Sequence, residues 1–84
     1  MRSKTKDIKE RVEVVLRSSE KDNRRTEMRI LHWIIDGKDT GPKLEKRDFF
    51  LKDGLKKTGR AVGFNRDDVR FIIDNLDEIK MFFQ

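Results

Sequence analysis

The chain has 84 residues, of which 44% are charged and 35% hydrophobic, and its formal net charge is +5. A chain of this length forms one small domain with a modest core, and the absence of cysteine excludes a disulfide framework or a thiolate metal site. The apolar residues are periodic and include six Phe, so the composition predicts a folded core inside a charged shell.

The positive charge is concentrated in the first part of the chain. Residues 1–65 contain 18 basic and 11 acidic side chains, whereas residues 66–84 contain three basic and five acidic ones. A basic surface beside an acidic segment favours a polyanionic partner, with nucleic acid as the first candidate. A charged surface that only keeps the domain soluble is the alternative.

The N-terminal residues 1–11 mix charges around one aliphatic residue, Ile8, and show no period. They predict a flexible basic arm in front of a single domain over residues 12–84. No apolar run approaches the roughly 20 residues that cross a bilayer, and no apolar segment follows the basic N-terminus. We therefore expect no membrane contact and an intracellular location, in the cytoplasm or nucleoid, or in a eukaryotic nucleus.

Alternation and β-branched residues predict four strands, over residues 12–19, 26–36, 43–51 and 58–64. In the first strand we expect Val12, Val14 and Leu16 to share one face. Both faces of the second strand are apolar, so it is expected at the centre of the sheet or in a subunit contact. Polar segments between the strands predict loops, and Pro42 is expected just before the third strand because it has no N–H to donate.

A helix is predicted to begin at about Arg66. Asn65 is suited to the N-cap position, and Asp67 and Asp68 place negative charge in the first turn. Apolar residues at spacings of three and four predict one stripe that covers the sheet, formed by Val69, Ile72, Ile73, Leu76, Ile79 and Phe83. The predicted fold class is therefore α+β: a four-stranded antiparallel sheet followed by one C-terminal helix, in the order β-β-β-β-α.

This order, together with two local motifs, resembles the positive cofactor four family of transcriptional coactivators and its bacterial and phage single-stranded-DNA-binding relatives. The resemblance covers residues 12–83. The residues that carry it are Trp33, the Gly37-Lys38 loop, Arg47-Asp48-Phe49, the basic turn with Lys56, Lys57, Gly59 and Arg60, and the helix entry at Asn65.

The resemblance implies a curved antiparallel sheet with the helix on its convex face, in a homodimer that forms partly through the helices. Opposed sheets would then hold single strands of nucleic acid. The implied function is non-enzymatic binding of single-stranded DNA, or of RNA, in transcription, replication or recombination. The partners are expected to be the nucleic acid, a second copy of the chain, and the transcription or replication machinery.

Binding of single strands without sequence preference needs cations along the phosphates and flat side chains on which bases stack. The strands place Arg29 on the same face as Trp33, and Arg47 on the same face as Phe49. Loop residues are expected to close over the backbone, and two arginines of the first hairpin extend the track. The full set of candidate nucleic-acid-binding residues is Arg17, Arg24, Arg25, Arg29, Trp33, Lys38, Lys43, Arg47, Phe49, Lys56, Lys57 and Arg60.

Two other functions fit the same residues. A small interaction module that docks on polymerase or another acidic partner is supported by the apolar end at residues 81–83 and by the basic face. A duplex-binding or RNA-binding domain would depend on Lys and Arg more than on rings. Trp33 and Phe49 also suit a core or an interface. Phe50 is expected in the core, and His32 is expected to be packed rather than to act as a ligand.

The sequence contains no motif of an enzyme. There is no second His and no Cys for a catalytic triad, no Walker-type phosphate loop and no Rossmann fingerprint. We therefore expect no enzymatic activity, no cofactor and no metal, and a single His makes a zinc site improbable. A metal-dependent nuclease built on Asp36, Asp48 and Asp53 is the remaining enzymatic alternative.

Overall fold

The computed structural model describes residues 6–84, apart from the side chain of Thr58, and contains one four-stranded antiparallel sheet followed by helices. The expected α+β class and strand order are confirmed. The elements are β1 (Ile8–Lys21), β2 (Arg24–Ile35), β3 (Lys38–Lys52), β4 (Leu55–Ala61), α1 (Arg66–Asp74), α2 (Leu76–Lys80) and the 3₁₀ helix η1 (Met81–Phe83). Residues 1–5 of the expected arm lie outside the described residues, and its last four residues, 8–11, are part of β1 rather than an arm.

All three connections between strands are two-residue turns. Both central residues of each turn have positive φ: 52° and 62° at Asp22 and Asn23, 51° and 82° at Asp36 and Gly37, and 55° and 77° at Asp53 and Gly54. Positive φ at both positions is what a tight type I′ hairpin requires, and Asp, Asn and Gly tolerate it best. The strands therefore run through polar residues that were predicted as loops.

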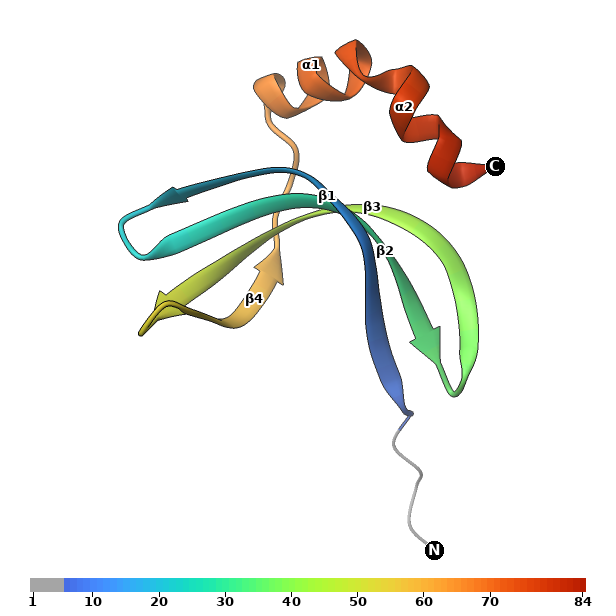
Figure 1. Cartoon of the computed structure of the whole chain (residues 1–84), viewed down its shortest axis with the longest axis horizontal. Coiled ribbons are helices and arrows are strands. Elements are labelled where there is room, and N and C mark those ends of the chain that lie inside the picture. The colour runs from blue at the N-terminus through green and yellow to red at the C-terminus, as the bar shows by residue number, and fades with distance from the viewer. Residues whose placement is uncertain (1–5) are drawn as a thin grey trace, which may run out of the picture.

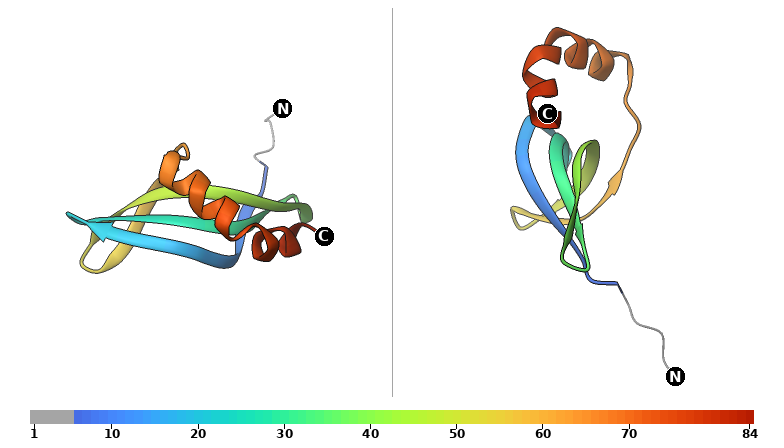
Figure 2. Two further views of the ribbon diagram at one scale, coloured as in Figure 1. Left: turned by 90° about the horizontal axis from the view of Figure 1, so that it is seen from above. Right: turned by 90° about the vertical axis from the view of Figure 1, so that its right-hand side faces the viewer.

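The sheet forms an arch, with the helices above its crest (Figure 1). Two further views show α1 and α2 on one side of the sheet only (Figure 2). We call the side under the helices the outer face and the opposite, concave side the inner face. The implied curvature and the implied position of the helix on the convex face agree with this arrangement.

Strand β2 lies between β1 and β3, and its six residues 27–32 are all buried. The expected central position of this strand is confirmed. The register along β1 shifts between Val12 and Val14 and again between Val15 and Arg17. Such a bulge changes which residues point to which face. Val12 consequently pairs with Leu31 on the inner face while Val14 pairs with Ile30 on the outer face, so the expected shared face of Val12, Val14 and Leu16 is wrong.

Pro42 lies inside β3, not before it. The register between β2 and β3 shifts between His32 and Ile34, whose partners are Pro42 and Asp39. Gly41, with φ of 93°, lies at this irregularity. A bulge leaves backbone N–H groups out of the ladder, so a residue without an N–H is tolerated there.

The single expected helix is divided at Asn75, whose side chain donates to the Phe71 carbonyl 2.8 Å away. Because the axis changes there, the expected stripe does not cover the sheet as one surface. Ile79 is buried, whereas Val69, Ile73, Leu76 and Phe83 are exposed. The C-terminal segment therefore presents one apolar side to the sheet and leaves a second one uncovered.

Asp68 fastens the start of α1 to the sheet. The predicted N-cap at Asn65 is confirmed, and Asn65 and Asp68 form a reciprocal capping box. The buried Asp68 carboxylate also accepts hydrogen bonds from Arg17 of β1 and, at 2.6 Å, from Lys46 of β3. Burial opposes ionisation of Asp68, but the bonds from Lys46, the Asn65 backbone and Arg17 outweigh it and hold its pKa below the usual value.

The apolar core is small. Within the described residues its buried members are Met28, Ile30 and Leu31 of β2 and Ile79 of α2. Within the same residues, no helix has the length and apolar character needed to cross a membrane.

Candidate nucleic-acid interface

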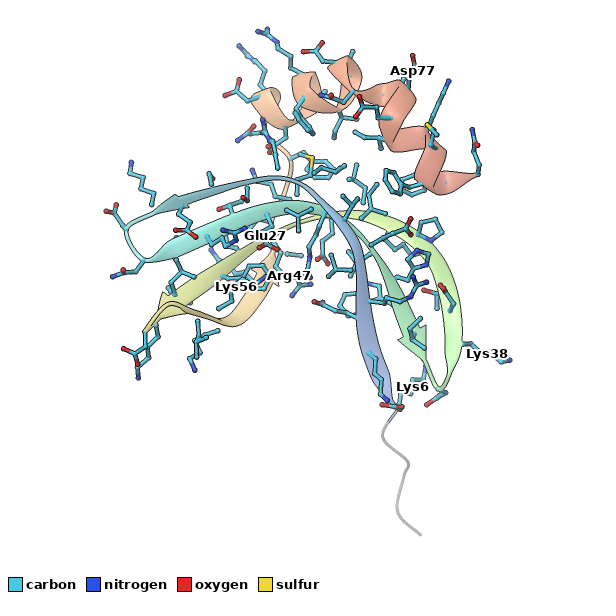
Figure 3. All side chains as sticks on the ribbon, in the orientation of Figure 1. Lys6, Glu27, Lys38, Arg47, Lys56 and Asp77 are labelled. Carbon is cyan, nitrogen blue, oxygen red and sulfur yellow. The ribbon has the colours of Figure 1, made fainter. Side chains whose placement is uncertain are left out.

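The inner face brings together most of the predicted binding residues. Cross-strand pairs point to the same side of a sheet, and these pairs join Arg25 with Phe49 and Arg29 with Glu45. Figure 3 shows Glu27, Arg47 and Lys56 together, on the opposite side of β1 and β2 from the helices. The predicted residues on it are Arg25, Arg29, Trp33, Lys43, Arg47, Phe49 and Lys56.

Two aromatic rings of the inner face lie against cations. The Arg47 guanidinium lies 5.9 Å from the centre of the Trp33 ring. Phe49 has two cationic neighbours, the Arg29 guanidinium at 5.3 Å and the Lys56 ammonium at 4.6 Å. These distances are within the range of cation–π attraction. The expected sharing of faces by Arg29 with Trp33 and by Arg47 with Phe49 is confirmed.

Glu45 connects the two rings through their arginines. Its carboxylate accepts two hydrogen bonds from Arg47, both 2.9 Å long, and two from Arg29, at 3.0 and 3.2 Å. Arg29 also donates to Glu10 of β1 at 2.8 Å. Burial raises the cost of ionising Glu45, but the bonds from Arg47 and Arg29 outweigh it and lower its pKa.

Glu27 organises the other end of the inner face. It is only 2% exposed, and its Oε2 accepts from Arg25 Nε at 2.6 Å and from Lys56 Nζ at 3.0 Å. Burial opposes its ionisation, but the Arg25 and Lys56 bonds prevail and lower its pKa. Arg25 also reaches Glu20 at 2.9 Å. Most inner-face cations are therefore already paired with carboxylates, a pairing that the sequence pattern did not predict.

Three predicted residues lie on the outer face instead. Arg17 bonds to Asp68 and lies over the Phe71 ring, so it anchors the helix. Arg24 lies 5.0 Å from the centre of the Phe50 ring, and Arg60 lines the same hollow of about 240 Å³ together with Arg24, Asp48, Phe49, Phe50 and Gly59.

The expected core position of Phe50 is wrong, because the residue is 57% exposed. The helices do not extend over this end of the outer face (Figure 1). Phe49 and Phe50 both line this hollow, although they are successive residues on opposite faces of β3. Phe50 could have been recognised as a candidate binding residue from its cross-strand partner Arg24. That pairing is known only once the register between β2 and β3 is known.

Lys38 and Lys57 complete the predicted set, and several of its members lie elsewhere than expected or have no carboxylate partner within residues 6–84. Lys38 begins β3 at the far tip of the β2–β3 hairpin, away from Arg47 and Lys56 (Figure 3). Lys56, Lys57 and Arg60 belong to β4 rather than to loops. Lys43 is exposed on the inner face, and the salt bridges found among the described residues do not include it.

His32 belongs to a separate cluster of charged side chains on the outer face. Its Nε2 lies 2.6 Å from Glu13 and its Nδ1 lies 2.9 Å from Asp39, which also accepts from Arg11. These two bonds raise the pKa of His32, with the Glu13 contact contributing most. The pKa of Asp39 is lowered to about 2. The hydrogen bond from the Gly41 backbone contributes most to this shift, followed by the bond with His32. His32 is thus a packed histidine that links three strands.

The described residues contain no group of three or more His, Asp or Glu side chains placed to hold a metal ion. Asp48 accepts from the Thr26 hydroxyl at 2.6 Å, while Asp36 and Asp53 belong to turns at the tips of different hairpins.

No family model matches the chain, and neither the curated proteins nor the solved structures include a significant match.

The absence of a Cβ at Gly59 leaves room for the Phe49 ring. A Cβ at residue 59 would lie 2.6 Å from both the Asp48 carbonyl oxygen and Phe49 Cδ1, closer than such atoms approach. We predict that Gly59→Ala destabilises the domain by about 1–3 kcal/mol, as overpacking does. Urea unfolding measures this change.

The matched control for Gly59→Ala is Gly63→Ala, because a Cβ at residue 63 meets nothing within 4 Å. It is expected to leave stability nearly unchanged. Equal stability of the two variants would contradict the role given to Gly59.

His32 makes stability depend on pH near neutrality. Its pKa is raised in the folded state, so its contribution is complete below the ordinary value of 6.5 and is lost as pH rises through the folded value. We predict falling stability above about pH 6.5. Urea unfolding between pH 5.5 and 8.5 measures it, with the His32→Gln variant, which should respond less, as control. A wild-type curve that is flat or rises over this window would contradict the prediction.

Proposed function

We propose that the chain is a non-enzymatic protein that binds single-stranded DNA, or RNA, as the positive cofactor four family and its relatives do. The observation that carries the proposal is the set of strand-borne rings, Trp33, Phe49 and Phe50, each lying against an Arg or Lys side chain. Rings and guanidinium planes both offer flat surfaces for unpaired bases. The proposal includes a role in transcription, replication or recombination.

Stacking on these rings favours single strands over duplexes. In a duplex the bases are paired and stacked on one another, so a ring can reach them only after the helix opens. Phe50 is the most accessible of the three rings, and the hollow beside it contains Arg24 and Arg60. A base on Phe50 would therefore have cations at hand for its adjacent phosphates.

The proposal includes a homodimer formed partly through the helices. Val69, Ile73 and Leu76 are exposed at spacings of four and three along α1 and the start of α2, with Ile73 65% exposed. The core buried within one chain is small, and a second copy would bury this stripe symmetrically. The same stripe supports the rival interaction module, which a mass measurement distinguishes from a dimer.

The binding prediction compares a labelled single-stranded 20-mer with the same sequence as a duplex, followed by fluorescence anisotropy at two salt concentrations. We expect preference for the single strand, a steep salt dependence, and quenching of Trp33, the one Trp of the chain. Phe50→Leu should weaken binding by about 1–3 kcal/mol through lost stacking.

The matched control for Phe50→Leu is Phe64→Leu, because Phe64 is also exposed but lies in the connection between β4 and α1. Its affinity should equal that of the wild type. Equal binding of duplex and single strand, without quenching of Trp33 fluorescence, would refute the proposed function and favour the interaction module.

The dimer prediction concerns mass in solution. We expect light scattering to give twice the 10.1 kDa of one chain, and Ile73→Glu to give a single-chain mass without loss of secondary structure. Arg70→Glu changes a neighbouring exposed residue off the apolar stripe and serves as control. A monomeric wild type at binding concentrations would refute the homodimer.

A further inference from the structure

The inner face carries carboxylates at the positions where a phosphate would meet its cations. Glu45 receives two parallel bonds of 2.9 Å from Nε and Nη2 of Arg47. This fork geometry is also the one in which arginine binds phosphate. The guanidinium of Arg47 lies beside the Trp33 ring, where a stacked base would bring its phosphate.

We propose that Glu45 is an intramolecular competitor of the nucleic-acid phosphate for Arg47, and so sets the affinity of the inner face. In the free protein Glu45 holds Arg47 over Trp33. When a single strand binds, a phosphate takes the place of the Glu45 carboxylate on Arg47. The inference rests on the proposed function and adds to it an acidic residue that lowers affinity.

The two arginines held by Glu45 differ in access. The side chain of Arg47 is 20% exposed, whereas that of Arg29 is 2% exposed and has a second partner in Glu10. Arg29 therefore stays with carboxylates after Glu45 is neutralised. Among the hydrogen bonds of residues 6–84, Arg47 then keeps the one to the Gly59 carbonyl, at 3.1 Å. Arg47 is the cation that a phosphate can capture.

Glu10 provides a control from the same ion-pair network. It also places one negative charge on the inner face, but it bonds directly to the buried Arg29 and acts on Arg47 only through space, without a salt bridge among the described residues. Neutralising Glu10 changes the net charge of the face as much as neutralising Glu45 does. Only the Glu45 change releases an accessible guanidinium.

The experiment measures binding of the labelled single-stranded 20-mer to full-length wild type, Glu45→Gln and Glu10→Gln over a salt series. We expect Glu45→Gln to bind about fivefold tighter, the effect of removing one partly exposed ion pair that competes with the phosphate for Arg47. The slope of log K against log salt should steepen by about 0.7, for one additional phosphate contact. The gain in affinity of Glu10→Gln should be less than about half of the gain of Glu45→Gln.

Circular dichroism and urea unfolding check that the variants fold. If Glu45→Gln does not fold, Glu45→Asp keeps the charge but withdraws the carboxylate by one methylene, and a smaller gain in affinity is expected. Wild-type affinity or weaker binding in the folded Glu45 variant would overturn the inference, as would an equal gain in Glu10→Gln, which would indicate net charge alone. A wild type that does not bind single strands refutes the proposed function itself.

Discussion

The charged residues buried in the middle of the sheet determine how the side chains of the inner face are paired. Glu27 and Arg29 are both 2% exposed as side chains, and their charged groups approach to 4.0 Å. A buried charge without partners costs several kcal/mol, on the order of 3–5 kcal/mol when a partner is removed. Each of the other three strands supplies a partner: Glu10 from β1, Glu45 from β3 and Lys56 from the edge strand β4. The position of β2 at the centre of the arch thus explains why the inner face is a network of ion pairs.

On the outer face a buried charge is also neutralised by partners from neighbouring strands, with fewer groups than on the inner face. Asp68 is the buried charge there, and Arg17 and Lys46 approach it from β1 and β3. Because the capping box of α1 uses the same carboxylate, helix formation and helix docking depend on one residue. The His32 cluster similarly joins β1, β2 and β3 through charged groups. A chain with a small apolar core relies on such contacts to hold its strands in register.

Function and stability draw on the same side chains of the inner face. Arg47 helps to neutralise Glu45 and also lies beside Trp33. In the proposed function this arrangement keeps a cation ready beside each stacking surface, at the expense of a competing carboxylate. Phe50, which has no such competitor among the ion pairs found in the described residues, offers the more open surface next to Arg24.

The sequence by itself determined the class of fold, the central strand, the N-cap at Asn65 and the shared faces of Arg29 with Trp33 and Arg47 with Phe49. These features follow from local periodicity and capping chemistry, which neighbouring residues decide. Only the tertiary structure decided the strand ends, the helix break at Asn75, and the pairing of Arg47 with Glu45. Bulges and two-residue turns set the register, and the register selects which charges meet across strands. Exposure of Phe50 depended on where the helices end over the sheet, which no spacing in the sequence encodes.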